Sequence, residues 1–190
     1  MRVALSVVLL GAACCARAAA PLAPAELMPA LAAVAASRAT FVETKRSALL
    51  KEPLVSRGTL AYRRPDSLEK HVLEPYDERI VLEGGRLTVD NRTRGRKTTV
   101  SLASAPQLGA LTESVRAVRA GDLAALEQHF EVRAEGTPER WTLSLAPLDE
   151  EVSRYVAGIV VSGAAGRITR IEVVEAGGDR SVMDIREDPK

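Results

Sequence analysis

The stretch RGTLAYRRPDSLEKHVLEP, which runs from Arg57 to Pro75, carries the clearest structural signal in the chain. Alternate residues of a β-strand share one face, so Leu60, Tyr62 and Arg64 are expected to point to the same side. Pro65 has no backbone N–H and restricts the residue before it to extended conformations, so the strand should end there. The sequence therefore predicts a permanent cation at the rim of an apolar strand face. An arginine that only extends to water from a sheet edge is the simpler alternative.

The segments around this stretch alternate apolar and polar residues with a period of two, which is typical of strands. Proline or glycine separates each segment from the next, as between strands joined by short turns. Ile80 and Leu82 fall on one face of their segment, and Leu87 and Val89 fall on one face of the following segment. The pattern predicts an antiparallel meander with one apolar side. The expected strands are residues 40–49, 54–64, 67–73, 77–82, 86–90 and 97–102.

Two segments have helical instead of strand-like spacing. Residues 24–37 are rich in alanine and carry Leu27, Leu31 and Val34 on one stripe. Residues 106–119 predict an amphipathic helix. Its apolar stripe consists of Leu108, Leu111, Val115 and Val118, whereas Glu113, Arg116 and Arg119 are expected to face elsewhere.

Asp122 is a suitable N-cap for a further short helix that carries Leu123, Leu126 and Phe130. Helices in the middle of a meander can cover the apolar face of the sheet as a movable lid, or they can fill that face permanently. Both alternatives fit the spacing.

The last third of the chain returns to strand patterns, which brings the expected total to roughly ten strands. A strongly twisted sheet of that size curls or closes partially. We therefore predict an α+β fold, mostly antiparallel β, shaped as a half-open β-barrel with lid helices over an apolar cavity. The late strands are expected at Trp141, Leu143 and Leu145, at residues 155–161, at Thr169, Ile171 and Val173, and at residues 180–186.

The N-terminus has the layout of a secretory signal peptide. Arg2 precedes an apolar run over residues 3–13, which is too short to span a bilayer, and small residues follow around Ala18. Cleavage near residues 18–20 would remove residues 1–18, including both cysteines, and leave residues 19–190 as a single domain without a disulfide. The alternative is a lipoprotein signal in which Cys14 is acylated.

Composition argues against a nucleic-acid-binding protein. The chain has 26 Lys and Arg against 25 Asp and Glu, so removal of Arg2 and Arg17 leaves 24 against 25, a formal charge of −1. Aromatic residues make up only 3% of the chain, and these are the residues on which single-stranded nucleic acids stack. A basic hairpin at residues 91–97 fits either a solvated turn or a contact with acidic partners.

Catalytic and metal-binding motifs do not emerge from the sequence. His71 and His129 belong to no metal-ligand spacing or serine triad, so we interpret both as structural residues. Residues 149–151 are acidic and are expected to form a solvated loop, since they lack the register of a calcium-binding loop. We predict that the protein is not an enzyme and uses no cofactor or metal.

The order of several short motifs resembles the LolA family of periplasmic outer-membrane lipoprotein carriers. The matching motifs are Phe41-x-Glu43, Gly58-x-Leu60, Arg64-Pro65, Pro75 and Gly84-Gly85, with Asp179-Arg180-Ser181 near the end, and they span about Leu27 to Ile185. Two positions depart from the family pattern: Glu43 replaces the usual glutamine, and Leu87-Thr88-Val89-Asp90 lacks the usual aromatic residues.

The resemblance implies that Arg64 is a gate that holds the lid helices closed by binding their backbone carbonyls. It also implies a periplasmic monomer that carries an acylated lipoprotein or another lipid from an inner-membrane donor complex to an outer-membrane acceptor. The implied apolar cavity is lined by Phe41, Leu60, Tyr62, Ile80, Leu82, Leu108, Leu111, Val115, Trp141, Leu143, Ile171 and Val173.

Two related roles remain open alternatives. A membrane-anchored receptor like LolB would require acylation of Cys14. A LolA-like sensor of envelope stress usually needs an additional domain that binds its partner. The sequence does not identify the cargo, which fits a lipoprotein, a glycolipid, a free acyl chain or a polyene lipid.

Overall fold

The computed structural model describes residues 21–104 and 106–188. The predicted signal peptide and Cys14 lie outside these residues. Within them, no helix is long and apolar enough to cross a membrane.

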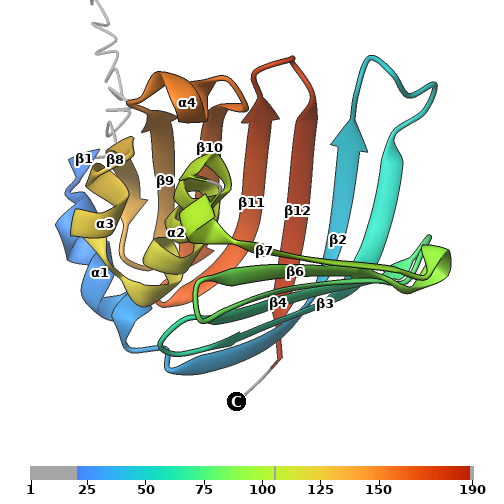
Figure 1. Cartoon of the computed structure of the whole chain (residues 1–190). Helices are drawn as coiled ribbons and strands as arrows, with labels where there is room; N and C mark the ends of the chain where they lie inside the picture. Colours follow the sequence, from blue (N-terminus) through green and yellow to red (C-terminus); the bar gives the residue numbers. More distant parts are fainter. Residues whose placement is uncertain (1–20, 105, 189–190) are drawn as a thin grey trace, which may run out of the picture.

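Twelve strands of the described residues form one antiparallel sheet, in the order β1-β8-β9-β10-β11-β12-β2-β3-β4-β5-β6-β7 (Figure 1). The outermost strands β1 and β7 do not pair with each other, so the sheet remains open. The predicted half-open, mostly antiparallel fold is therefore confirmed. The strands are β1 (Pro21–Leu22), β2 (Ala36–Arg46), β3 (Leu54–Arg63), β4 (Ser67–Glu74), β5 (Glu78–Glu83), β6 (Arg86–Asn91), β7 (Arg96–Ser101), β8 (Phe130–Thr137), β9 (Arg140–Pro147), β10 (Val156–Ala164), β11 (Arg167–Glu175) and β12 (Arg180–Glu187).

Every predicted strand is present, with ends displaced by a few residues, but β1 and β8 were not predicted. β1 has only two residues, and it exists because it pairs with β8, more than a hundred residues later. Phe130 was assigned to a short helix, whereas it is the first residue of β8. The charged residues of β8 occupy its exposed face, while Phe130 and Ala134 are buried on the other.

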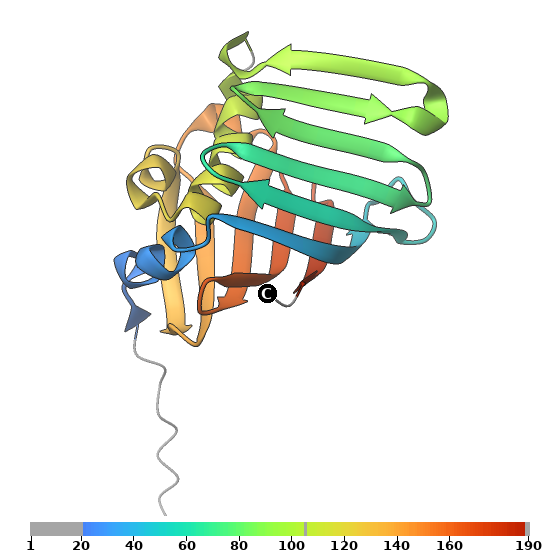
Figure 2. The same ribbon diagram turned by 90° about the horizontal axis from the view of Figure 1, so that it is seen from below.

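The helices lie on the concave side of the sheet. Figures 1 and 2 show that β8–β12 and β3–β7 form two parts inclined steeply to each other, with β2 between them and α2 lying in the angle. The helices are α1 (Pro24–Ala32), α2 (Pro106–Ala120), α3 (Leu123–Glu127) and α4 (Glu150–Ser153). The first helix is shorter than predicted because the chain turns into β2 at Ala36.

The two shortest helices begin at aspartate caps. The Asp122 carboxylate accepts a hydrogen bond from the Ala125 N–H at 3.1 Å, which confirms the predicted N-cap of α3. The Asp149 carboxylate accepts one from the Val152 N–H at 2.7 Å and so caps α4. The prediction of a plain loop at residues 149–151 was therefore wrong.

The main core lies between the helices and strands β8–β11. Complete burial of each large apolar side chain there stabilises the fold by about 1.5–3 kcal/mol. The largest fully buried side chains are Trp141, Phe130, Leu27, Leu31, Leu126, Leu143 and Val152.

Trp141 packs so closely on β10 that only glycine fits at position 163. The indole Nε1 donates a hydrogen bond to the Ala165 carbonyl at 2.8 Å, which fixes the orientation of the ring. A Cβ atom at Gly163 would lie 2.3 Å from Cζ2 of this ring and 2.3 Å from the Arg167 carbonyl oxygen.

We expect Gly163→Ala to lower the free energy of unfolding by about 1–3 kcal/mol, because the core cannot make room for the added methyl group. Urea unfolding followed by circular dichroism measures this loss. Gly177→Ala is the matched control, since a Cβ there meets nothing within 4 Å. The control should change the free energy by no more than about 0.5 kcal/mol. Equal losses in both variants would contradict the tight packing of Trp141.

Candidate functional site

The concave face contains two adjoining hollows under α2. An inner cavity of about 110 Å³ lies between α2 and strands β2, β3, β4, β11 and β12. An outer trough of about 320 Å³ lies between α2 and strands β3–β6. Both are lined by Leu60, Leu68 and Val115, so they form one continuous apolar surface.

The predicted lining residues fall into three groups. One group lines the inner cavity or the outer trough: Leu60, Tyr62, Ile80, Leu82, Val115 and Ile171. A second group lies in the packed core or against it: Phe41, Trp141, Leu143 and Val173. The side chains of Leu108 and Leu111 lie outside the described residues. Residues that line the inner cavity without having been predicted include Ala39, Leu68, Ile168, Met183 and Ile185.

The antiparallel register explains why β4–β6 present a continuous apolar surface to α2. Leu68 is paired with Leu82, Leu82 with Leu87, and Ile80 with Val89. Directly paired residues lie on the same face of a sheet, so all of these side chains point to the concave side. The two apolar faces predicted from the sequence are therefore one face.

Arg64 follows the end of β3, and its guanidinium meets the ends of two helices. Nη2 donates to the carbonyl oxygen of Ala32, the last residue of α1, and lies 3.4 Å from that of Ala120, the last residue of α2. The last carbonyls of a helix lack partners within the helix and carry partial negative charge, so a cation at this point is favourable. Arg64 is itself exposed to solvent.

The ends of α1 and α2 lie close together because glycine follows α2. Gly121 has φ of 67°, a left-handed conformation that favours glycine and ends the helix. A Cβ atom on Gly121 would lie 2.3 Å from the carbonyl oxygen of Met28 in α1. This close approach brings both helix ends within reach of Arg64.

Arg119 faces the interior, so the prediction that it faces away from the apolar stripe was wrong. Its side chain on α2 is only 7% exposed and lies 2.7 Å from the Glu187 carboxylate, which is 12% exposed. The guanidinium also donates to the Ser37 hydroxyl and, at 3.2 Å, to the Gly166 carbonyl. Glu187 is 68 residues away in the chain, and helical spacing carries no signal of such a partner.

Tyr62 borders both Arg119 and the inner cavity. The Arg119 guanidinium carbon lies 5.5 Å from the centre of the tyrosine ring, within the range of a cation–π contact. Tyr62 is 4% exposed, and its hydroxyl has no hydrogen-bond partner among the described residues. The inner cavity therefore has one polar end, formed by Tyr62, Arg119, Ser37 and Glu187, and a wall that is apolar apart from Glu69.

A second polar cluster lies on the concave face beyond the apolar region. Lys70 Nζ lies 2.5 Å from the Glu43 carboxylate and 5.2 Å from the centre of the Phe41 ring. The Ser181 hydroxyl donates to the same carboxylate at 2.7 Å. Nearby, the hydrogen bond to Glu175 raises the pKa of Lys45 above its usual value. Glu43, the residue that departs from the family pattern, thus has its own two partners.

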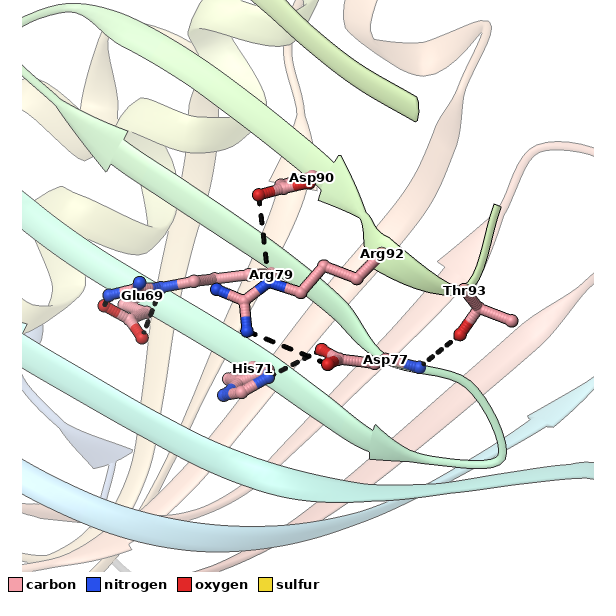
Figure 3. Close-up of polar contacts among 7 residues, drawn as sticks. All are labelled: Glu69, His71, Asp77, Arg79, Asp90, Arg92 and Thr93. Carbon is pink, nitrogen blue, oxygen red and sulfur yellow. Dashed lines mark hydrogen bonds and ion pairs between the residues drawn. The ribbon is translucent and has the colours of Figure 1, made fainter. Parts of the chain in front are cut away.

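The face of β4–β6 turned away from α2 carries an ion-pair network (Figure 3). Glu69 binds Arg79 through two hydrogen bonds of 2.8 and 2.6 Å, which raise the pKa of Arg79 above its usual value. His71 Nε2 lies 2.8 Å from Asp77, whose other carboxylate oxygen lies 3.7 Å from Arg92. Among the described residues, no group of His, Cys, Asp or Glu side chains could hold a metal ion. These contacts hold strands together on the face opposite the trough.

The curled sheet, the apolar trough and the covering helices define a half-open barrel of the kind that binds ligands on its concave face. The sequence profile of the family described as "Outer membrane lipoprotein carrier protein LolA-like" matches residues 16–183, so the chain belongs to this family. The resemblance seen in the sequence motifs is thereby confirmed. Members of this family are binding or carrier proteins of the cell envelope.

Several solved structures are similar to the chain. A LolA superfamily protein from Nitrosomonas europaea has a TM-score of 0.46 and 14% identity, over 89% of this chain and 94% of that one. A putative outer membrane lipoprotein-sorting protein domain from Vibrio parahaemolyticus has a TM-score of 0.43 and 10% identity, over 87% and 91%. A chain of the Pseudomonas aeruginosa MucA/MucB complex has a TM-score of 0.43 and 14% identity, over 87% of this chain and 57% of that one. No curated protein matches the chain at a significant level.

We expect Glu187→Ala to lower the free energy of unfolding by about 3 kcal/mol, because it leaves the buried Arg119 cation without its carboxylate. Glu131→Ala is the matched control, since its ion pair with Arg133 is exposed and contributes at most about 1 kcal/mol. Chemical denaturation of the two variants measures the difference. A loss of free energy of unfolding in Glu187→Ala no larger than that in Glu131→Ala would contradict the anchoring of α2 by Arg119.

Proposed function

We propose that this protein is a periplasmic carrier that binds the acyl chains of a lipoprotein, or of another lipid, and moves them towards the outer membrane. The observation that carries the proposal is the apolar trough under α2, together with the single exposed arginine that contacts the ends of both covering helices. Membership in the LolA-like family supports the same function.

An acyl chain needs only apolar surface that is shielded from water. Each methylene group transferred from water to such a surface contributes about 0.8 kcal/mol, so no elaborate polar site is required. Leu60, Leu68 and Leu82 supply apolar surface of this kind in the outer trough, and Val115 of α2, which is partly exposed, borders it. The protein would act by binding and release, without catalysis, cofactor or metal.

Loading requires α2 to move away from the sheet. The inner cavity of about 110 Å³ is smaller than the roughly 300–1,000 Å³ of typical ligand pockets. Val115 of α2 borders both hollows, so displacement of α2 would merge and enlarge them. Cargo that binds better to this opened state shifts the protein towards it.

Arg64 would act as the gate for this movement. Hydrogen bonds from a charged donor contribute about 1.5–3 kcal/mol when shielded, and less at an exposed position. The contacts to Ala32 and Ala120 are therefore strong enough to hold α1 and α2 together and weak enough for cargo to break.

The carrier function also implies a compartment and partners for this protein. Residues 1–18 would direct secretion, and residues 19–190 would act as one monomeric carrier domain in the periplasm. An inner-membrane donor complex would load the cargo, and an outer-membrane acceptor would receive it.

Native mass spectrometry with lipid extraction tests the proposal on protein purified from the periplasm. We expect a mature mass without Cys14 and a co-purifying acylated molecule. A mature chain that begins at an acylated Cys14 would indicate a membrane-anchored receptor instead. A chain that neither retains nor takes up any lipid would overturn the carrier function.

We expect Arg64→Leu to leave the free energy of unfolding within about 1 kcal/mol of the original, because the side chain is exposed. Transfer of a fluorescent diacylated lipopeptide from the loaded protein to vesicles should slow by about fivefold or more, because the closed, empty state loses the contacts that favour it and the open, loaded state becomes relatively more stable. Stopped-flow fluorescence measures this rate.

Arg63→Leu is the control for that measurement. Arg63 lies next to Arg64 but is on the opposite side of the strand, and it contacts Glu83 at 3.4 Å. Its replacement removes the same charge without touching the helix ends. Equal transfer rates in Arg64→Leu and Arg63→Leu would contradict the gate role of Arg64.

A further inference from the structure

We propose that the inner cavity binds the ester or amide carbonyl of an acylated cargo, with the Tyr62 hydroxyl as the hydrogen-bond donor. This inference rests on the proposed carrier function, which it extends from the acyl tail to the group that joins the tail to the rest of the molecule. It assigns a polar role to a residue that the sequence placed among the apolar lining.

The first observation is the buried and unpartnered hydroxyl of Tyr62. The residue is 4% exposed and lines the inner cavity, and its hydroxyl has no partner among the described residues. Buried hydroxyl groups almost always have a partner, because burying one without a hydrogen bond is unfavourable. The hydroxyl has almost no accessible surface with α2 in place, so a ligand oxygen would satisfy this group once α2 moves to admit cargo.

The charges around Tyr62 select an uncharged ligand group. The Arg119 guanidinium is already paired with Glu187 at 2.7 Å, so the polar end of the cavity has no net charge. Arg119 and Glu187 both line the cavity, so a free carboxylate would meet no unpaired cation there to offset the loss of its hydration. A carbonyl oxygen accepts a hydrogen bond without bringing a charge, which fits an ester or an amide better than a fatty acid.

The volumes of the two hollows indicate that the carbonyl end of the acyl group lies in the inner cavity and that its hydrocarbon tail lies in the outer trough. A cavity of about 110 Å³ holds only a few non-hydrogen atoms, given that one water molecule occupies about 30 Å³ in the liquid. Leu60, Leu68 and Val115 continue from this cavity into the outer trough of about 320 Å³. The carbonyl therefore binds beside Tyr62, and the hydrocarbon chain extends along the trough.

The experiment compares four probes that share a ten- or eleven-carbon chain: methyl decanoate, N-methyldecanamide, decanoate and undecane. Their affinities for the secreted full chain are measured by displacement of the fluorescent dye N-phenyl-1-naphthylamine. The measured quantity is the affinity of each carbonyl probe relative to that of undecane, because undecane has no polar group to strip of water. We expect this carbonyl preference to be about five- to tenfold higher for the ester, the amide or both in the original chain than in a chain without the Tyr62 hydroxyl, as one hydrogen bond allows. Tighter binding of the ester would indicate a glycerolipid-like cargo, and tighter binding of the amide would indicate an N-acylated cargo.

Tyr62→Phe keeps the ring beside Arg119 and removes only the hydroxyl. We expect it to bind undecane as the original chain does and to lower the preference for the carbonyl probes by about five- to tenfold. Its melting temperature should stay the same or rise, because an unpartnered buried hydroxyl is removed. Tyr155→Phe is the matched control, since Tyr155 is 51% exposed, and it should keep the preference.

Two results would overturn the inference. One is a carbonyl preference, relative to undecane, that persists unchanged in Tyr62→Phe. The other is decanoate binding as tightly to the original chain as its methyl ester, which requires no variant to fold. If undecane also failed to bind, the carrier function would fall together with the inference, whereas undecane binding alone would leave the carrier function intact.

Discussion

The apolar concave face of the sheet must be kept from water, and most other features of the molecule follow from that constraint. Antiparallel pairing places Leu68, Leu82 and Leu87 on one face, where they would be exposed if nothing covered them. Because the sheet does not close, its opposite edge cannot provide the cover. The chain instead leaves the sheet after β7 and inserts α2 into the angle between the two parts of the sheet, as Figure 2 shows.

Two arginines hold α2 in this position, and their interactions differ in strength because one side chain is buried and the other is exposed. Arg119 is almost fully buried and bonds to Ser37, Gly166 and Glu187, so it fixes the C-terminal part of the helix to three distant segments. Arg64 is exposed, and its guanidinium binds helix-end carbonyls. Breaking a buried, fully paired cation is far more costly than breaking an exposed contact. The protein therefore combines a buried, fully paired arginine with an exposed and weaker arginine contact, on the same short length of α2.

Local patterns in the sequence account for much of the fold. Period-two alternation and the separating prolines and glycines locate the strands, and the strand-face position of Arg64 follows from the residues before it. Most failures involve partners distant in the chain, whereas the short helix α4 was missed although its Asp149 cap is local. β1 is defined only by its pairing with β8, and the orientation of Arg119 depends on Glu187, 68 residues later. In the site, Leu60, Tyr62 and Val115 were predicted, whereas Ile168, Met183 and Ile185 were not, because hydrophobicity alone does not distinguish a cavity wall from a packed core.

The two unpaired edges of the sheet bear on the size of the acyl group that the proposed carrier could enclose. In a closed barrel, the number of strands and their shear fix the radius. A larger ligand can then be enclosed only if smaller side chains line the interior. Here the order of strands ends at β1 on one side and at β7 on the other, and no ring of hydrogen bonds sets a radius. Small adjustments in strand twist would therefore change the curvature without breaking a ring of hydrogen bonds. In the proposed carrier, this openness would let one set of lining residues enclose acyl groups of different width.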